Sequence, residues 1–272
     1  MPAPPLGSDP AIDSATRMSA LATLIRDLKR RRGRERRGLA LAEGVRLVEE
    51  AMAAGIPIRG AAVSPALEAT RRGEALKGAL VAAGVKLEAV DDRALGELAD
   101  TEHPQGVVAV IEPREWFLDD IALTPRSAVL VLDAVQDPGN VGTMLRTALA
   151  LGAAGVVALP GTADLSNPKV IRGSMGALFR LPCVATDPDT LSVWAGNHEA
   201  GTWVTAVDGD PVPRGVRTSP VLLVLGNEGA GVGDTMTARA TGRVGIPLQP
   251  GAESLNVAIA AGILLYEVLR AD

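Results

Sequence analysis

Short, unbroken apolar runs alternate with helix-like segments through the second half of the sequence. The run Ala128-Val-Leu-Val-Leu, for example, offers no polar residue to either face of a strand. A strand of this kind must be covered on both faces, as in a parallel sheet between two layers of helices. We therefore predict an α/β fold. The predicted strands span residues 128–133, 156–159, 183–186, 203–207, 221–225 and 244–248, and the predicted helices span 141–151, 168–179, 191–195 and 255–270.

The first 113 residues predict a smaller, separate unit. Strand patterns at 37–41, 58–63, 85–90 and 105–111 alternate with helix patterns at 43–54, 65–83 and 91–99. This alternation predicts a small three-layer α/β domain over residues 17–113. Residues 1–16 carry four prolines and little periodicity, which predicts a disordered tail. Residues 114–126, with Trp116 and Phe117, form the predicted linker to a second domain over residues 127–272.

The composition excludes several classes of protein. Hydrophobic residues make up 47% of the chain, yet no apolar run is long enough to span a bilayer, and no basic-then-apolar signal peptide opens the sequence. We expect a cytoplasmic protein without a membrane anchor. Cys183 is the one cysteine, which excludes an intrachain disulfide and a cysteine zinc cluster. The two histidines, His103 and His198, lie outside ligand-spaced motifs, so no metal site is predicted.

Charge is distributed unevenly along the chain. The net charge is −5 and aromatic residues make up 2%, which is not the usual composition of a nucleic-acid binder that stacks many bases. Positive charge nevertheless gathers in one run, which contains Arg26, Lys29, Arg30, Arg31, Arg32, Arg34, Arg36 and Arg37 against only Asp27 and Glu35. Such a run is typical of a solvated helix face, of a disordered arm or of a phosphate-binding surface.

Three loops carry the residues that suggest chemistry, and each follows a predicted strand. In open α/β sheets, ligands bind beyond the carboxyl ends of the strands. The first loop, Asp137-Pro-Gly-Asn140, has turn composition, and Asn140 is a candidate cap for the following helix. Arg146 lies six residues further on, among apolar neighbours. In that setting an arginine either pairs with an acceptor or extends to solvent.

The second loop, Leu225-Gly-Asn-Glu-Gly-Ala-Gly-Val, is rich in glycine, which allows a ligand to approach the backbone closely. It matches neither the phosphate-binding Walker loop nor the dinucleotide fingerprint, and a plain turn would not explain Glu228 among the glycines. The third loop, Ile246-Pro-Leu-Gln-Pro-Gly-Ala-Glu-Ser-Leu-Asn256, ends where the last helix begins. Ser254 is the candidate cap of that helix, whose free N–H groups favour an acceptor or an anion.

Taken together, in this order and at this spacing, the three loops closely resemble the motifs of the SpoU (TrmH-like) branch of the SPOUT methyltransferases. The resemblance covers the whole second domain and includes Asn167-Pro-Lys-Val-Ile-Arg-Gly-Ser-Met-Gly. The first domain is similar to the substrate-binding domain of many rRNA-modifying members. The matching stretches there are Ala40-Leu-Ala-Glu-Gly-Val-Arg-Leu-Val and Thr101-Glu-His-Pro-Gln-Gly-Val-Val-Ala-Val.

The resemblance implies a fold, a cofactor and a reaction. It implies an α/β sheet with a deep trefoil knot, a homodimer, and S-adenosylmethionine-dependent 2'-O-methylation of RNA. Positions that match the cofactor contacts of the family, or lie beside them, are Leu225, Gly226, Gly229, Ile246, Ser254 and Leu255. Positions that match its other site residues are Asn140, Arg146, Glu228, Ser254 and Asn256.

Arg146 matches the family arginine that is proposed to activate the ribose hydroxyl. A guanidinium rarely gives up its proton, so we interpret Arg146 as a clamp on the phosphate beside the reacting ribose. Asn140 is expected to hold Arg146 and the substrate, and Glu228 to orient the first loop or the arginine. Ser254 and Asn256 are expected to shape the cofactor loop and contact RNA. The RNA-binding surface is expected to comprise Arg30, Arg31, Arg32, Arg34, Arg36, Arg37 and Arg146.

The first domain favours ribosomal RNA, 23S rRNA in particular, over transfer RNA as the substrate. Alternatives are a tRNA 2'-O-methyltransferase and a non-catalytic RNA-binding or ribosome-assembly protein of the same fold. A base-methylating SPOUT enzyme is less consistent with the motifs. A nucleotide-dependent dehydrogenase is disfavoured because the glycine fingerprint and its acidic partner are missing.

Overall fold

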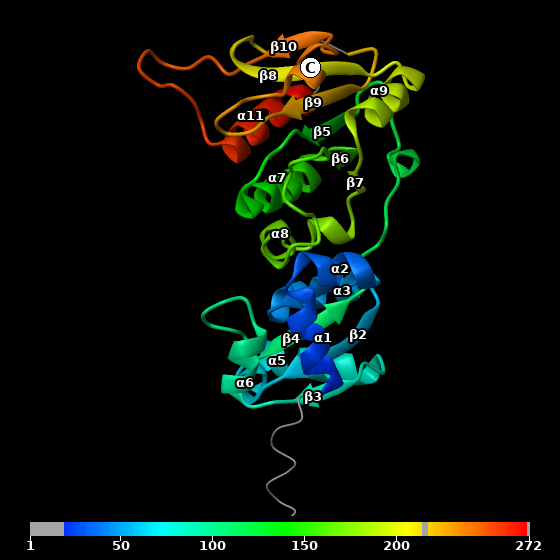
Figure 1. Ribbon diagram of the computed structural model, residues 1–272, viewed down its shortest axis with the longest axis vertical. Coiled ribbons are helices and arrows are strands. Elements are labelled where there is room, and N and C mark those ends of the chain that lie inside the picture. The colour runs from blue at the N-terminus through cyan, green and yellow to red at the C-terminus, as the bar shows by residue number, and fades with distance from the viewer. Residues whose placement is uncertain (1–18, 214–216, 271–272) are drawn as a thin grey trace, which may run out of the picture.

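A six-stranded parallel sheet forms the C-terminal unit, residues 128–269, of the computed structural model, which describes residues 19–213 and 217–270 (Figure 1). The predicted parallel sheet is therefore confirmed. In sheet order its strands are β10 (Gly242–Val244), β8 (Gly201–Asp210), β9 (Val221–Leu225), β5 (Ala128–Leu132), β6 (Gly155–Ala158) and β7 (Cys183–Ala185).

Alternate residues of these strands face two separate layers of helices. Leu130 and Leu223 belong to a buried cluster with the helices of one face, whereas Val129 and Val224 belong to a cluster with those of the other. This two-residue period explains why the strands have no polar face. The first layer contains α7 (Pro138–Leu151), α8 (Pro168–Ser174), the 3-10 turn η2 (Ala177–Phe179) and α11 (Val257–Leu269). The second contains α9 (Pro188–Asn197), α10 (Asp234–Thr237) and the segment around η1 (Leu118–Asp120).

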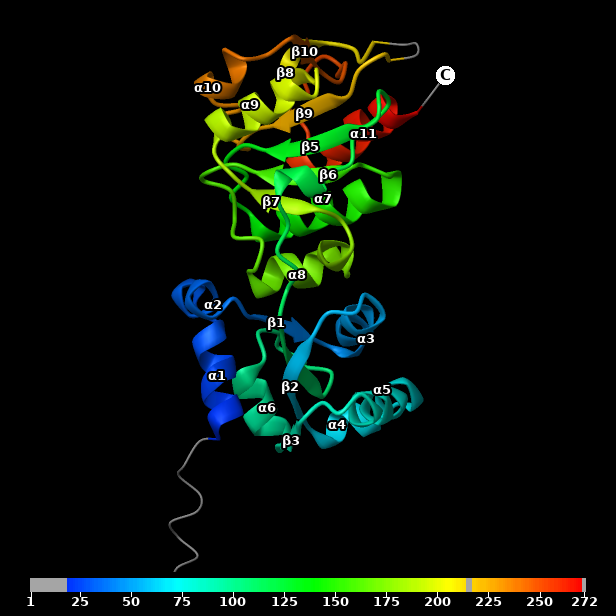
Figure 2. The same ribbon diagram turned by 90° about the vertical axis from the view of Figure 1, so that its right-hand side faces the viewer.

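The N-terminal unit, residues 20–111, is built around a four-stranded mixed sheet in which β2 and β3 are parallel and the other pairs are antiparallel. In sheet order its strands are β1 (Ala40–Glu43), β4 (Val107–Ile111), β2 (Ile58–Val63) and β3 (Leu87–Ala89). Two groups of helices cover the two faces, so the three-layer prediction is confirmed (Figure 2). They are α1 (Ala20–Leu28) and α6 (Asp92–Leu98) on one face, and α3 (Val45–Ala53), α4 (Pro65–Glu68) and α5 (Arg71–Ala82) on the other; α2 (Arg31–Arg37) follows α1.

Several expected elements differ from the structure at their ends. The single helix expected over 65–83 is interrupted between α4 and α5, where Thr70 caps α5. The helix expected over 168–179 ends at Ser174, because Met175 adopts a left-handed conformation with φ +50°. The strand expected over 244–248 instead begins at Gly242 and ends at Val244. The predicted disordered tail, 1–16, lies outside the described residues.

The arginine run folds as helices rather than as an extended arm. Its residues lie at the end of α1, throughout α2 and, for Lys29 and Arg30, at the cap positions between the two helices; Gly38, with a left-handed φ of +63°, ends α2. In the described part of the chain, no helix is long and apolar enough to cross a membrane.

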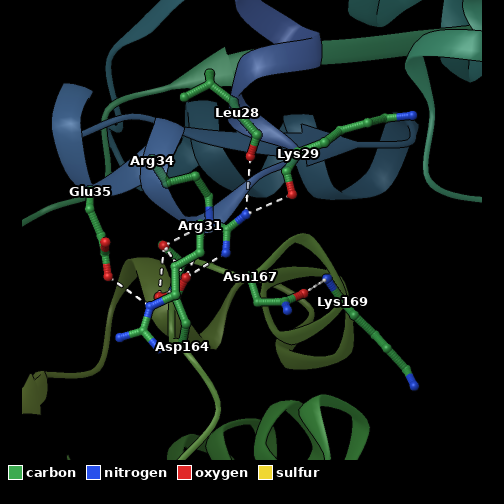
Figure 3. Close-up of polar contacts among 9 residues, drawn as sticks. Leu28, Lys29, Arg31, Arg34, Glu35, Asp164, Asn167 and Lys169 are labelled. Carbon is green, nitrogen blue, oxygen red and sulfur yellow. Dashed lines mark hydrogen bonds and ion pairs between the residues drawn. The ribbon is translucent and has the colours of Figure 1, made fainter.

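The buried side chain of Arg34 joins the two units. Its guanidinium bonds to Asp164, in the loop before α8, with Nη2 at 2.5 Å from Oδ2 (Figure 3). Nε donates to Ser166 Oγ at 3.0 Å, and Nη1 donates to the carbonyls of Leu28 and Lys29. The Arg34 residue is 4% exposed, whereas its partner Asp164 is only partly buried. Arg34 therefore fixes α2 against the C-terminal unit.

Further contacts surround this ion pair at the junction. Arg180 Nη1 lies 2.5 Å from Glu50 Oε2 on α3, and Arg172 Nη2 lies 3.2 Å from Asp100 Oδ2. The cluster of buried apolar residues that includes α7 and α8 also continues into α3 and β1. The two units are thus held by both ion pairs and shared apolar packing, with α8 lying between them (Figure 2).

Replacing Arg34 by alanine is expected to lower the free energy of unfolding by about 3 kcal/mol, because it leaves the half-buried Asp164 carboxylate without its counter-ion. Arg31→Ala is the matched control. Arg31 forms its ion pair with Glu35, at the exposed i,i+4 position, and interacts with Asp164 only through weaker long-range attraction, so its loss should cost less than about 0.5 kcal/mol. Urea denaturation of both variants measures the difference, and equal effects would contradict this role of Arg34.

The difference in stability between wild type and Arg34→Ala should depend on pH. Burial raises the pKa of the Asp164 carboxyl, but hydrogen bonds from Arg34 and Ser166 outweigh it and hold the pKa below its ordinary value. A carboxyl with a lowered folded-state pKa stabilises the fold above its unfolded pKa of about 3.9, and that contribution disappears as the pH falls through the folded-state pKa. The stability difference between wild type and Arg34→Ala should therefore be complete at pH 6 and shrink below about pH 4.

Candidate active site at the strand ends

The pairing of β5 with β9 brings two of the motif loops together. Leu132 and Leu225, the last residues of these strands, are partners in the parallel register. Asp133 continues the contact, since its N–H donates to the Leu225 carbonyl at 2.8 Å and its Oδ2 accepts from Gly233 N–H at 2.7 Å. The first and second motif loops therefore start side by side at one edge of the sheet.

Asn227 shapes the glycine-rich loop, and the sequence analysis did not single it out. Its Oδ1 accepts from Gly229 and Ala230 N–H, while its Nδ2 donates to the Ala134 carbonyl in the first loop. Ala134 has a left-handed φ of +57°, which alanine adopts only when its surroundings hold it there. An asparagine beside Glu228 in a glycine-rich turn was the available signal, because asparagine bonds to nearby backbone groups.

The side chain of Asn140 connects all three motif loops. Its Nδ2 donates to Glu228 Oε1 at 2.8 Å, and its Oδ1 accepts from Asn256 Nδ2 at 3.1 Å. Asp137, not Asn140, caps α7, since Asp137 Oδ1 accepts from Asn140 N–H. The cap prediction for Asn140 was wrong, and the correction explains how its side chain is free to reach the other loops.

The third loop also differs from expectation at its cap. Asn256, not Ser254, caps α11, because Asn256 Oδ1 accepts from Ala258 and Ile259 N–H at 3.0 and 3.3 Å. The helix thus begins two residues later than predicted. Ser254 is exposed and remains in the loop beside the cavity described next.

A cavity of about 400 Å³ opens beside these loops. Backbone of the glycine-rich loop forms one wall, and apolar side chains of the third loop and α11 form much of the rest. All the predicted cofactor positions line it, namely Leu225, Gly226, Gly229, Ile246, Ser254 and Leu255. Ile246 and Leu248 reach the cavity because β10 ends early and leaves both residues in a loop.

Gly226 is required by the tight winding of the second loop. Asn227 and Gly231 exchange two backbone hydrogen bonds, which bring Gly231 back onto Gly226. A Cβ atom at Gly226 would lie 2.1 Å from the Gly231 carbonyl carbon, well inside contact distance. Only glycine therefore permits this wall of the cavity, which presents backbone rather than side chains to whatever occupies it.

Arg146 does not join this network. It lies on the exposed face of α7 and has no hydrogen bond or ion pair with any residue that the structure describes. The structure therefore supports the solvent-directed alternative over a buried, paired arginine. Asn140 uses its amide on Glu228 and Asn256, so the expectation that Asn140 holds Arg146 is not met within this single chain.

The six predicted RNA-binding arginines from Arg30 to Arg37 divide into three groups. Arg34 is buried at the junction, so its assignment to RNA binding was wrong: its guanidinium is already bonded to Asp164, Ser166 and two carbonyls. Three exposed arginines, Arg31, Arg36 and Arg37, pair with Glu35 or Asp27. Arg30 and Arg32 are exposed and have no partner among residues 19–213 and 217–270.

Cys183 and His198 show no feature of a catalytic or metal-binding residue. Cys183 is buried, and burial raises the pKa of its thiol to about 12, as expected for a structural cysteine. Within the described ranges there is no group of three or more acidic, histidine or cysteine side chains that could hold a metal ion. His198 Nδ1 lies 2.8 Å from the Trp194 carbonyl and packs on that indole ring.

Comparison with known proteins places the fold and site in a family. The SpoU rRNA Methylase family profile matches residues 127–266, and that of the MRM3-like substrate binding domain matches residues 23–109. The chain therefore belongs to the SpoU rRNA methylase family.

Individual relatives agree with this placement. The chain is 34% identical to the 23S rRNA (uridine(2479)-2'-O)-methyltransferase of Streptomyces viridochromogenes, over 89% of this chain and 86% of that protein. It is 36% identical to the 23S rRNA (guanosine(2553)-2'-O)-methyltransferase RlmP of Bacillus subtilis, over 68% of this chain and 73% of that protein. The crystal structure of the S. viridochromogenes SpoU methyltransferase AviRb with its cofactor AdoMet aligns with a TM-score of 0.81 at 31% identity, covering 93% and 98% of the two chains.

The hydrogen bonds of Asn256 predict different losses of stability for two substitutions at this position. Asn256→Ala removes both the α11 cap and the bond to Asn140, and should lower the free energy of unfolding by about 1 kcal/mol. Asn256→Asp keeps a capping oxygen and adds a negative charge at the helix N-terminus, so it should retain most of that stability. Guanidinium denaturation compares the two, and equal destabilisation would show that the cap is not what Asn256 contributes.

Proposed function

We propose that the chain transfers a methyl group from S-adenosylmethionine to a ribose 2'-hydroxyl of 23S rRNA. The observation that carries this proposal is the cavity at the strand ends, which all the predicted cofactor positions line beside the linked Asn140, Glu228 and Asn256. Relatives at 34% and 36% identity are named as 23S rRNA 2'-O-methyltransferases.

The cavity suits S-adenosylmethionine in size and chemistry. Its volume of about 400 Å³ lies within the usual range of small-molecule sites. Apolar side chains such as Ile246 and Leu255 suit the adenosine ring, and the backbone groups of the loop at Gly226 suit its polar edges. The bound cofactor supplies an electrophilic methyl group on a sulfonium.

The protein's part of the chemistry concerns the nucleophile. A ribose hydroxyl is a very weak acid, so the site must align it and stabilise the negative charge that develops. Arg146 would clamp the adjacent phosphate and stabilise that charge, while the hydroxyl proton leaves to water or to the phosphate. Asn140, held by Glu228 and Asn256, would orient the loop that faces the ribose.

A homodimer would complete this site. Helix α11 is apolar nearly all round, yet Ile259 is 57% exposed and Tyr266 is 49% exposed. Ile263 on α11 and Leu149 on the adjacent α7 are also exposed apolar residues. Such a helix is normally buried, and a second copy of the chain would cover it. Arg146 also lies on the exposed face of α7. In a single chain it is separate from the candidate active site, and the dimer would bring it to such a site.

The two units have distinct proposed roles. Residues 17–113 would form the RNA substrate-binding domain, 114–126 the linker and 127–272 the methyltransferase domain, in line with the matched profiles. A trefoil knot in the latter is what membership of the SpoU family implies. An rRNA substrate favours a cytoplasmic location.

Incubation with methyl-labelled S-adenosylmethionine and unmodified 23S rRNA or tRNA tests the reaction. Nuclease digestion of the RNA should place the label in a 2'-O-methylnucleoside from 23S rRNA. Label only in tRNA would favour the tRNA enzyme instead. Cofactor binding without label in either RNA, or in ribosome-assembly intermediates, would favour a non-catalytic RNA-binding protein.

Arg146→Ala should lower kcat at least about 100-fold, the loss typical of removing one group that stabilises transition-state charge. The Kd for S-adenosylmethionine should stay within about twofold, because Arg146 does not line the cavity. Arg146→Lys keeps the charge but loses the two-pronged geometry, so its kcat should also fall. A wild-type kcat in the lysine variant would rule out the clamp.

Arg30 and Arg32 should bind RNA phosphates. The double variant Arg30→Ala/Arg32→Ala should weaken rRNA binding and reduce the slope of log K against log salt by about 1.5, as expected for two lost phosphate contacts. The control, Arg71→Ala/Arg93→Ala, removes two exposed arginines from α5 and α6. Fluorescence anisotropy across a salt series measures both, and identical slopes would remove α2 from the RNA-binding surface.

A charge placed on the α11 face should disrupt the dimer. Ile259→Glu/Tyr266→Glu is expected to sediment as a monomer, whereas the wild type sediments at twice the chain mass, because a carboxylate in an apolar interface is costly. Val193→Glu, on the exposed surface of α9, is the control and should leave the dimer intact. A monomeric wild type would contradict the proposed assembly.

A further inference from the structure

A second cavity, of about 250 Å³, lies where the two units meet. We call it the junction pocket. The N-terminal unit contributes Arg46, Thr101, His103 and Gln105, and the C-terminal unit contributes Arg172 and Met175. Two stretches of the first domain resemble the family, residues 40–48 and 101–110. Both contribute residues to the junction pocket, which has no part in the reaction proposed above.

The junction pocket is built by a fixed framework. Glu43, buried at the end of β1, accepts from the N–H groups of Asp100 and Thr101 at 2.8 and 3.2 Å. Asp100 in turn accepts from Arg172 Nη2 on α8. Because the Arg34–Asp164 ion pair elsewhere at the junction also joins the two units, the walls of the pocket are held in place before any ligand enters.

Met175 forms an apolar part of the wall in a strained conformation. It ends α8 with φ +50°, a region that non-glycine residues seldom occupy. Such strain persists only where surrounding structure imposes it, and it occurs most often at functional sites. The Met175 thioether and the Leu47 side chain give the pocket a polarisable, apolar surface of the kind that packs against a flat ring.

The polar part of the wall has unused hydrogen-bonding capacity. Arg46 and His103 are exposed and bond to nothing in the portion of the chain that the structure describes. Arg172 Nη1 also lacks a hydrogen-bond acceptor there, its nearest carboxylate oxygen, on Glu43, being 3.7 Å away. Cationic donors next to an apolar surface suit a ligand with a phosphate and a flat, polar-edged ring.

Helix α8 connects the junction pocket to the candidate active site. Lys169 lies one turn before Arg172 on the same helix, and its Nζ is 3.7 Å from Oδ2 of Asp137, the cap of α7. Residues three apart lie on one helix face, so basic side chains lead from the pocket toward Asn140. A polyanionic strand lying along α8 would reach both the junction pocket and the candidate active site. This reach favours a nucleotide within RNA over a free mononucleotide as the ligand of the pocket.

We propose that the junction pocket captures one unstacked nucleotide of the substrate RNA, distinct from the nucleotide that is methylated. Its base would pack on Met175 and Leu47, and its phosphate would bind Arg46 and His103. Recognition of splayed-out bases is the usual way in which proteins read RNA sequence. The proposal rests on the proposed function only in its choice of RNA as ligand.

Steady-state methylation of unmodified 23S rRNA by the full chain tests this role. Arg46→Ala/His103→Ala should raise the KM for rRNA roughly tenfold or more. Its kcat should stay within about threefold of wild type, and its Kd for S-adenosylmethionine should not change. Arg71→Ala/His198→Ala removes the same two residue types elsewhere and should leave the KM near the wild-type value. An unchanged KM in the first variant, with an active wild type, would overturn the pocket and leave the proposed function intact.

Cross-linking gives a readout that does not depend on activity. The full chain is irradiated with 23S rRNA containing 4-thiouridine and digested with trypsin, and the nucleotide-bearing peptides are identified by mass spectrometry. Cross-links are expected on the peptides 94–114 and 173–180, which contain His103 and Met175, and an excess of adenosine monophosphate should not remove them. Cross-links confined to other peptides would overturn the proposal, and competition by the mononucleotide would assign the pocket to a free ligand. If the wild type methylates no RNA, the proposed function fails while these cross-links still decide the pocket.

Discussion

The parallel pairing of β5 with β9 is the constraint on which the candidate site depends. Because both strands run in the same direction and end in register, the loops that follow them must meet. Asp133 and Asn227 then fasten one loop to the other, and Asn140 can bond to Glu228 although the two residues lie 88 positions apart. The cavity follows from this arrangement, since its backbone wall is the loop that Gly226 allows to close.

The contacts at the junction hold the two units in one relative orientation. A single buried ion pair would be weak evidence for stability, because desolvation offsets much of its attraction. Here Arg34 is satisfied by four acceptor groups, and apolar packing continues across the same boundary. A fixed orientation matters for an RNA enzyme, because contacts made by the first unit can place a distant ribose at the second only if the two do not rotate freely.

The sequence predicted the parallel sheet and the three-layer first unit, because these follow from local patterns of apolar residues, and it placed the candidate site in loops at strand ends. Strands 58–63 and 221–225 match to the residue. It could not predict contacts between distant residues: the burial of Arg34 depends on Asp164, 130 positions away. Nor could it choose between Ser254 and Asn256 as a cap, since both residue types serve equally well. The strand predicted over 244–248 overlaps the observed β10 only at Val244, because the pairing with β8 that sets its ends is a contact between distant residues.

The central claim is that the cavity at the strand ends holds S-adenosylmethionine, and calorimetric titration of the purified chain tests it most directly. Wild type should bind one equivalent per chain. Gly226→Ala should lose binding, because a Cβ there meets the Gly231 carbonyl, whereas Gly196→Ala on α9, where a Cβ would have nothing within 4 Å and which does not line the cavity, should retain it. Equal affinity in wild type and Gly226→Ala, or no binding by the folded wild type, would contradict the assignment of this cavity.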